Sequence, residues 1–294
     1  MKNLTLKGCG TALLTPFKAD GSVDYEAFAA SVDRQIEAGI HFLVPLGTTG
    51  ETPCLSEKER IEILKTAKAH CAGRPVVVGG GTNSPEGTIA SMRQLEPYGP
   101  DAFLIVVPYY NKPTQEGQYQ YFKAVAAATR KPVIIYNVPG RTGANIEAST
   151  VLRLAREVPN IVAVKEASGR YSQISEIIAG APEGFSVLSG NDDETLSLMA
   201  TGANGVISVA SNVAPVEMVQ LVEAMLADSL QEARELHHRL FPLMKALFVE
   251  SNPGPAKYAC AKLGLMENVL RLPLVPVGPA TEKIVDKTLA DLWK

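Results

Sequence analysis

The sequence is poor in the side chains that build metal centres and disulfides. Its 294 residues include four cysteines and four histidines. The cysteines, at positions 9, 54, 71 and 260, form no C-x-x-C pair and match no zinc-binding spacing. None of the histidines, at positions 41, 70, 237 and 238, lies at the end of a predicted strand with a partner. We therefore expect free thiols in a reducing compartment and no metal site.

The sequence also lacks a large excess of charge of either sign, and it lacks long hydrophobic runs. Lys and Arg total 28 against 31 Asp and Glu, and no Lys/Arg-rich run of five occurs, which argues against nucleic-acid binding. Apolar stretches such as 103–107 are strand-sized and far too short to span a membrane. The first ten residues, MKNLTLKGCG, contain no apolar core or cleavage site of a signal peptide. These features predict a cytoplasmic protein.

Short apolar runs alternate with helical stretches along most of the chain. Because the runs are continuously apolar, they are typical of parallel strands that are covered on both faces. Most begin roughly 20 to 34 residues apart, about the length of one strand and one crossover helix. The predicted strands are 10–14, 42–46, 76–79, 102–107, 133–136, 161–165, 185–188 and 205–208.

The intervening segments have helix signals. Asp24 can cap a helix that Gly39 ends, and Ser56 with Glu59 forms a capping box. Eight strand–helix units predict a (β/α)8 barrel, with a doubly wound open sheet as the alternative. Beyond about residue 228 the strand signal stops, and 231–247 and 255–263 are expected to be helices. We therefore divide the chain into a barrel, 1–227, and a helical C-terminal region packed on it, 228–294.

In such a barrel the functional groups lie at the carboxyl ends of the strands. Lys165 ends one predicted strand, on the same face as Ile161 and Ala163. If that face is the barrel interior, desolvation disfavours the charged lysine, and a free amine can form a Schiff base with a carbonyl. The alternative is a lysine that reaches solvent at the strand end without any chemical role.

Other strand ends supply groups suited to a small acid. Tyr136 ends the preceding strand, where its phenol could relay protons near Lys165 or simply cap the core. Residues 47–51, GTTGE, offer backbone N–H groups and two hydroxyls to a carboxylate. Arg141 follows a Pro-Gly pair and is either a carboxylate clamp or a surface ion-pair partner.

The loop after the seventh strand bears on the substrate. Barrels that bind sugar phosphates usually hold the phosphate around strands seven and eight. Here that loop reads Gly190-Asn191-Asp192-Asp193, and two adjacent acids would repel a phosphate. We therefore expect the substrate to be a carboxylate and not a phosphate ester.

Taken together, the motifs at the strand ends resemble one family over nearly the whole chain. The segments 47–51, 136–143 and 164–166, supported by 108–111 and 252–257, are similar in order and spacing to those of the dihydrodipicolinate synthase / N-acetylneuraminate lyase family. The resemblance implies a class I lyase that uses no metal or other cofactor. It implies that Lys165 condenses with pyruvate.

The resemblance also implies roles for other residues. Thr48 and Thr49 would bind the pyruvate carboxylate, and Gly190 and Ile207 would line the substrate site. Tyr136, Thr48 and Tyr110 would form a proton relay, in which Tyr110 comes from the neighbouring subunit. A dimer is then the minimal active unit, and a homotetramer built as a dimer of dimers is the expected assembly.

Arg141 favours the synthase branch of the family. It matches the arginine that receives the carboxylate of L-aspartate 4-semialdehyde, which neuraminate lyases and 2-keto-3-deoxy sugar acid aldolases generally lack. The expected reaction is the condensation of pyruvate with that aldehyde to 4-hydroxy-tetrahydrodipicolinate, on the diaminopimelate route to lysine. An aldolase of the second kind, with the same Schiff-base chemistry, is the alternative within the family, and a barrel that only binds a small acid is the alternative outside it.

The resemblance finally implies a regulatory pocket. Many synthases of the family bind L-lysine at the dimer interface, near the segment after the GTTGE motif. Asn83 and Tyr109 match positions of that pocket, whereas Arg60 and Gly87 depart from it. A guanidinium beside the ammonium groups of lysine is repulsive, and Glu57 could neutralise part of it. We therefore expect weak inhibition by lysine or none.

Overall fold

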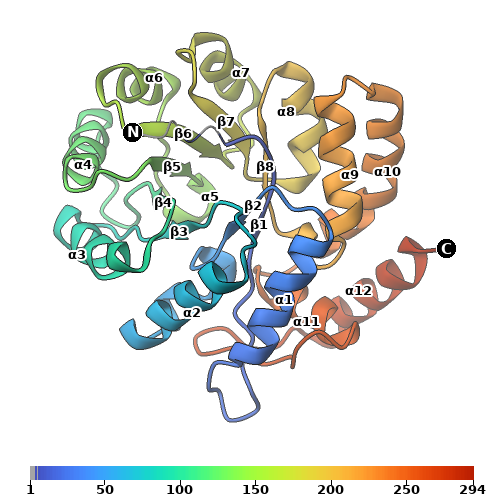
Figure 1. Ribbon diagram of the computed structural model, residues 1–294. Helices are drawn as coiled ribbons and strands as arrows, with labels where there is room; N and C mark the ends of the chain where they lie inside the picture. Colours follow the sequence, from blue (N-terminus) through green and yellow to red (C-terminus); the bar gives the residue numbers. More distant parts are fainter. Residues whose placement is uncertain (1–3, 5) are drawn as a thin grey trace.

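Eight parallel strands form the centre of the molecule in the computed structural model, which describes residue 4 and residues 6–294 (Figure 1). Residues 1–3 and 5, part of the ten-residue segment interpreted above, lie outside the described residues. The strands are β1 Gly8–Ala12, β2 Phe42–Val44, β3 Val77–Gly79, β4 Ala102–Val106, β5 Val133–Asn137, β6 Ile161–Glu166, β7 Ser186–Ser189 and β8 Gly205–Ser208.

The strands close into a barrel. β1 pairs with both β2 and β8, and from β3 to β8 each strand pairs with the next. The seam between β2 and β3 is the thinnest, with one parallel bridge between Leu43 and Val76 and a hydrogen bond from Gly79 N to Pro45 O of 3.2 Å. A Cβ on Gly79 would lie 1.8 Å from Leu46 O, so this close approach requires glycine. The predicted (β/α)8 barrel is confirmed.

Helices surround the strands, as Figure 1 shows. Asp24 accepts a hydrogen bond from Ala27 N at the start of α1, and Ser56 and Glu59 form the predicted capping box of α2. The helices of the barrel are α1 Tyr25–Glu37, α2 Glu57–His70, α3 Pro85–Leu95, α4 Gln115–Ala127, α5 Pro139–Thr142, α6 Ala148–Glu157, α7 Tyr171–Gly180, α8 Thr195–Thr201 and α9 Pro215–Leu226.

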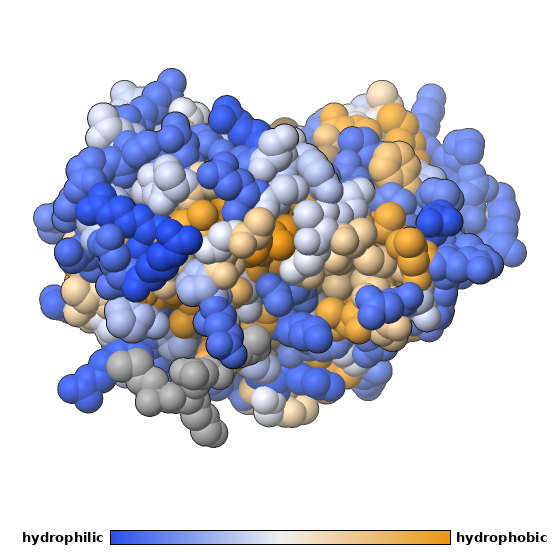
Figure 2. Space-filling view, turned by 90° about the horizontal axis from the view of Figure 1, so that it is seen from above, coloured by the Kyte–Doolittle hydropathy of each residue, from blue (hydrophilic) through white to orange (hydrophobic). Residues whose placement is uncertain are grey.

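The C-terminal region is helical and lies on one side of the barrel, beside α9 (Figure 1). Its helices are α10 Leu230–Ala246, α11 Gly254–Lys262 and α12 Pro279–Leu292. The first two begin one residue before the predicted bounds, and α12 was not predicted individually. Within the described residues, no helix is long and apolar enough to cross a membrane. The face seen in Figure 2 is mostly hydrophilic, with hydrophobic residues exposed in separate patches.

The buried apolar side chains form two clusters, one inside the barrel and one in the shell between the strands and the helices. The interior cluster takes side chains from alternate strand positions, including Val44, Leu104, Tyr136, Ala163 and Leu188. The shell cluster takes the other strand positions and the inner faces of the helices. This alternation is the period-2 pattern of a strand, and it directs the side chains at the strand ends into the barrel mouth.

One prediction for β6 was wrong. Lys165 and Ala163 share the interior face, but Ile161 packs in the outer shell. The reason is a register shift: Val133 pairs with Ile161, and the next residue, Ile134, pairs with Ala163. The extra residue on β6 is a β-bulge, which reverses the side-chain alternation at the start of the strand. Lys165 nevertheless points inward, because the regular pairing resumes before it.

Candidate active site

Lys165 and Tyr136 form the centre of the candidate site. The two residues pair directly on neighbouring strands β6 and β5. The Nζ atom of Lys165 lies 4.3 Å from the centre of the Tyr136 ring. Both side chains are buried, with 6% and 8% of their surface exposed. An amine is therefore held beside a phenol in a mostly apolar barrel, which is the arrangement that imine chemistry with proton transfer requires.

The outer face of the same strand pair carries a second polar contact. Asn137 and Glu166 follow Tyr136 and Lys165, and the Asn137 amide donates to the Glu166 carboxylate over 3.0 Å. Gln173 Nε2 and Ser168 N donate to the same carboxylate. Burial raises the pKa of Glu166, and these hydrogen bonds oppose the rise. The contact holds the two strand ends in register, and sequence reasoning did not identify it.

The GTTGE segment forms a short 3-10 helix, Thr48–Gly50, after β2. Thr15 Oγ1 donates to Gly50 O, and Thr52 Oγ1 donates to Gly47 O. Glu51 adopts a left-handed conformation with φ of 52°. Its fully buried carboxylate lies 2.5 Å from Lys257 Nζ and accepts a hydrogen bond from Arg271 N. The segment is therefore fixed from both sides, and Thr49 is buried within it.

A small cavity of about 50 Å³ joins these elements. It has room for a ligand of only a few atoms. The adjoining cavity of about 400 Å³ shares several of its walls and opens between α2, α5 and the loop after β4. Residues that line the small cavity include Thr48, Thr49, Tyr136, Arg141, Lys165, Gly190, Phe248 and Asn252.

Arg141 stands at the rim of both cavities, on the short helix α5. Its Nη2 donates to the backbone oxygen of Asn252 over 3.1 Å. The side-chain amide of Asn252 in turn donates to Thr49 Oγ1 over 3.0 Å. The guanidinium is thus aimed across the barrel mouth by the C-terminal region, and its exposed position leaves it free to receive an anion.

Gly190 and Ile207 lie close to the lysine. A Cβ on Gly190 would meet Ala167 Cβ at 2.6 Å and Lys165 Cε at 3.1 Å, so a larger residue would displace the lysine stem. Ile207 is fully buried in the interior cluster and does not line the small cavity. It therefore supports the floor of the barrel mouth.

The structure does not bring Tyr110 to the site of its own chain. The side chain is 88% exposed, and its backbone is left-handed with φ of 70°. It lines neither of the two cavities, whereas its neighbour Tyr109 lines the larger one. A role in catalysis within the same subunit is therefore incompatible with its position.

The two acids after β7 are both engaged. Asp192 is buried, and its Oδ2 accepts hydrogen bonds from Val209 N and Ala210 N. Burial raises its pKa, against the effect of hydrogen bonds with Ser208, Ala210 and Val209. Asp193 pairs with Lys245 over 3.2 Å. The backbone donors after β8, which a phosphate would use, are thus already occupied, which is a stronger reason for a carboxylate substrate than charge repulsion alone.

The C-terminal region contributes two residues that sequence reasoning did not assign to the site. Phe248 and Asn252 line the small cavity, although they follow α10 and lie far from the barrel motifs in sequence. The segment 252–257 had a family-like pattern, but nothing in that pattern indicated contact with Thr49.

All four cysteines are free thiols. Among the described residues, no group of three His, Cys, Asp or Glu side chains could hold a metal ion.

Comparison with known proteins adds independent information. A model of the dihydrodipicolinate synthetase family matches residues 5–292. The 4-hydroxy-tetrahydrodipicolinate synthase of Koribacter versatilis is 50% identical over 290 residues, which cover 98% of this chain and 96% of that protein.

Solved structures are similar over the same extent. The dihydrodipicolinate synthase of Thermotoga maritima superposes with a TM-score of 0.96 at 44% identity, covering 98% of this chain and 99% of that one. The chloride-inhibited dihydrodipicolinate synthase of Acinetobacter baumannii, in complex with pyruvate, gives a TM-score of 0.95 at 39% identity over 98% of this chain and 99% of the other. These likenesses extend over both the barrel and the C-terminal helices.

Proposed function

The chain belongs to the dihydrodipicolinate synthetase family, and from that premise we propose how its barrel works. It is a lyase that condenses pyruvate with L-aspartate 4-semialdehyde to 4-hydroxy-tetrahydrodipicolinate, a step in lysine biosynthesis. The observation that carries the assignment of the reacting group is the position of Lys165 Nζ, buried in the barrel mouth 4.3 Å from the centre of the Tyr136 ring.

The reaction begins with attack of the Lys165 amine on the ketone of pyruvate. Loss of water leaves an imine, with the carboxylate of pyruvate on Thr48 and Thr49. Removal of a methyl proton converts the imine to an enamine, which attacks the aldehyde carbon of the second substrate. When the methyl proton is removed, the protonated imine nitrogen of Lys165 accepts the electron pair of the broken C–H bond. The chain's own lysine therefore serves as the electron sink.

Arg141 binds the carboxylate of the second substrate. The exposed guanidinium at the cavity rim is the cation that a second carboxylate needs. After carbon–carbon bond formation, the amine of the former aspartate semialdehyde displaces Lys165 by transimination. The ring closes, and the free lysine is regenerated.

Tyr136 moves the protons of these steps at its phenol oxygen, together with Thr48 and with Tyr110 of a second subunit. Tyr110 is exposed, has a left-handed backbone and does not reach the site of its own chain, which supports a role at the site of a neighbour. We propose a dimer as the minimal active unit and a homotetramer, a dimer of dimers, as the assembly.

We further propose that residues 1–227 form the catalytic barrel and residues 228–294 a supporting region. The supporting region is helical and places Phe248 and Asn252 at the small cavity. Its contribution to the site is therefore to close one wall and to hold Arg141 in place.

Trapping with borohydride tests the nucleophile. Pyruvate plus borohydride should attach one three-carbon acid to each chain, and mass spectrometry should place it on Lys165. Lys165→Ala should remove the label and lower turnover about 1,000-fold or more, since covalent catalysis is lost. Lys262→Ala, which removes an exposed lysine, is the matched control. Full labelling of Lys165→Ala would refute the assignment.

A substrate comparison tests the branch. With pyruvate present, the enzyme should consume L-aspartate 4-semialdehyde in a coupled assay and should not cleave N-acetylneuraminate or 2-keto-3-deoxy sugar acids. Efficient cleavage of either acid, with no use of the semialdehyde, would place the chain with the aldolases that share its Schiff-base chemistry.

A further inference from the structure

Asn252 links the loop after β2 to the short helix α5 across the barrel mouth. Its side-chain Nδ2 donates to Thr49 Oγ1 over 3.0 Å, and its backbone oxygen accepts from Arg141 Nη2 over 3.1 Å. The residue is 4% exposed and lines the small cavity that also contains Lys165. It is therefore in direct contact with a group assigned to pyruvate and with a group assigned to the second substrate.

The direction of the bond to Thr49 decides what that hydroxyl can do. A hydroxyl has one hydrogen to donate and two lone pairs that accept. When Asn252 Nδ2 occupies a lone pair of Thr49 Oγ1, the hydroxyl hydrogen remains available to another acceptor. If the amide were reversed, Thr49 would spend its hydrogen on Asn252 Oδ1 and could offer a carboxylate only lone pairs.

The remaining atom of the amide makes no competing contact. Asn252 Oδ1 is buried, and no hydrogen-bond partner for it occurs in the described part of the chain. The donor nitrogen is the atom directed at the threonine, beside the cavity of about 50 Å³.

We propose that Asn252 is a positioning residue that sets the polarity of the Thr49 hydroxyl, so that its hydrogen is donated to the carboxylate of pyruvate. Asn252 acts through Thr49 and needs no contact with the substrate. This inference rests on the proposed function in one respect, namely that pyruvate is the acid bound beside Lys165.

Two measurements separate this inference from the proposed function. Calorimetric titration with pyruvate reports binding whether or not an imine forms, and borohydride trapping reports the imine alone. Asn252→Ala should weaken pyruvate binding about tenfold, because the Thr49 hydroxyl is then free to rotate and its hydrogen is no longer directed at the carboxylate. Asn252→Asp should weaken it further, about 100-fold, because an acceptor reverses the Thr49 hydroxyl and places a negative charge beside it.

A control with the same chemical change excludes a general effect of asparagine in this region. Asn268 also has a buried, unpartnered Oδ1, but it does not line the small cavity. Asn268→Asp should therefore leave pyruvate binding within twofold of the wild type. Circular dichroism and thermal melting should show that every variant remains folded.

A double-variant cycle shows whether Asn252 acts through Thr49. In a Thr49→Val background, Asn252→Ala should cause less than a twofold further loss, because the hydroxyl that it positions is gone. Thr49→Ser keeps the hydroxyl and should restore the tenfold effect of Asn252→Ala.

The outcomes are distinct. A tenfold loss that persists in the Thr49→Val background, or an Asn252→Asp variant that binds pyruvate better than Asn252→Ala, overturns the inference even if trapping is normal. Binding that depends on Asn252 without any trapped adduct supports the inference and overturns the imine. A wild-type protein that does not bind pyruvate overturns both.

Discussion

At the scale of single residues, the two basic side chains of the site have different environments. Lys165 is buried between β5 and β7, whereas Arg141 is exposed at the rim and held by one backbone oxygen. The buried group suits covalent chemistry, and the exposed group suits reversible binding of an anion. Their effects on catalysis should therefore be separable.

Arg141→Ala tests that separation. We expect trapping of pyruvate to remain near the wild-type level, since Arg141 does not touch Lys165 in the proposed mechanism. The half-saturating concentration of L-aspartate 4-semialdehyde should rise on the order of 30-fold, because a hydrogen bond to a charged group is worth about 2 kcal/mol. Arg141→Lys should recover only part of the loss, because lysine lacks the planar fork. Normal use of the semialdehyde by Arg141→Ala would contradict the assignment.

Arg60 is a second residue whose environment predicts a function. It lines the cavity of about 400 Å³ together with Pro53, Gly81 and Tyr109, and its Nε donates to Leu55 O. Glu57 bonds to Gln94 Nε2 over 2.9 Å and lies outside the lining of that cavity. The Arg60 guanidinium is therefore held in place, and the Glu57 carboxylate does not lie beside it.

A titration of the coupled assay with L-lysine tests this consequence. Millimolar lysine should inhibit the wild type weakly or not at all, because its ammonium groups meet a fixed cation. Arg60→Ala should lower the half-inhibitory concentration several-fold, whereas Arg93→Ala, on the exposed side of α3, should leave it unchanged. Strong inhibition of the wild type at this level would show that lysine binds away from Arg60.

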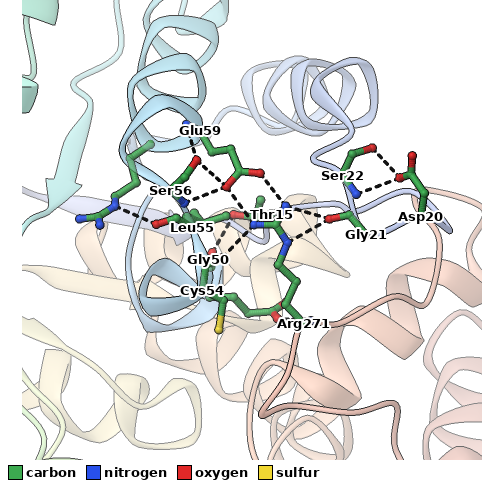
Figure 3. Close-up of polar contacts among 12 residues, drawn as sticks. Thr15, Asp20, Gly21, Ser22, Gly50, Cys54, Leu55, Ser56, Glu59 and Arg271 are labelled. Carbon is green, nitrogen blue, oxygen red and sulfur yellow. Dashed lines mark hydrogen bonds and ion pairs between the residues drawn. The ribbon is translucent and has the colours of Figure 1, made fainter.

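At the scale of elements, the loops after β1 and β2 are fastened to the C-terminal region by Arg271. Its guanidinium donates to both oxygens of Glu59 and to the backbone oxygens of Gly21 and Cys54, as Figure 3 shows. It also stacks on Phe17, with 4.5 Å between the guanidinium carbon and the ring centre. One side chain thereby joins the segment before α1, the start of α2 and the segment after α11.

The acid stability of the protein should report this junction. Hydrogen bonding to Arg271 lowers the pKa of Glu59 to about 2. A carboxylate with a lowered pKa stabilises the fold above its unfolded pKa, near 4.5, and that contribution is lost as the pH falls through about 2. Arg271→Ala should therefore lower the melting temperature by about 5 °C at pH 7.

The difference between the two proteins should shrink between pH 5 and pH 2, where the Glu59 contribution disappears. A residual difference should persist from the bonds to Gly21 and Cys54, which do not titrate. Arg271→Lys keeps the charge but lacks the planar guanidinium, so its melting temperature should lie between those of the wild type and Arg271→Ala. A difference that is independent of pH would show that Glu59 and Arg271 are not coupled in solution.

Elements differed in how well the sequence predicted them. The bounds 205–208 agree with β8, and the other strands lie within two residues of their predicted bounds, because continuous apolar runs mark strands buried on both faces. The bulge in β6 was not predictable, since it depends on the pairing of Val133 with Ile161. The bond between Asn252 and Thr49 spans 203 residues, a contact that no local pattern encodes.

At the scale of the whole molecule, the position of Tyr110 has a consequence for assembly. The residue is exposed and strained, and the sequence motif around it predicted a role that its own subunit cannot accommodate. The family resemblance supplied the interpretation that the tyrosine completes the site of a neighbour. The contact itself depends on the surface of a second subunit, which no motif within one chain encodes.

Subunit mixing tests the proposal. Tyr110→Phe should lower turnover while leaving the fold and pyruvate trapping intact. Lys165→Ala should be inactive. When the two variants exchange subunits, a mixed dimer contains one site with both Lys165 and the partner's Tyr110, so activity should rise above that of either variant alone. Wild-type activity in a protein that sediments as a monomer would contradict the proposal.

The contact between Thr49 and Asn252 also bears on the order in which the candidate site is assembled during synthesis of the chain. A ribosome that has released the first 227 residues has supplied Lys165, Tyr136 and Thr49, but not the amide that bonds to Thr49 or the lysine that neutralises Glu51. The nascent barrel therefore holds Lys165 before its GTTGE segment is fastened. The two contacts that fix this segment from the C-terminal side form only when most of the message has been read.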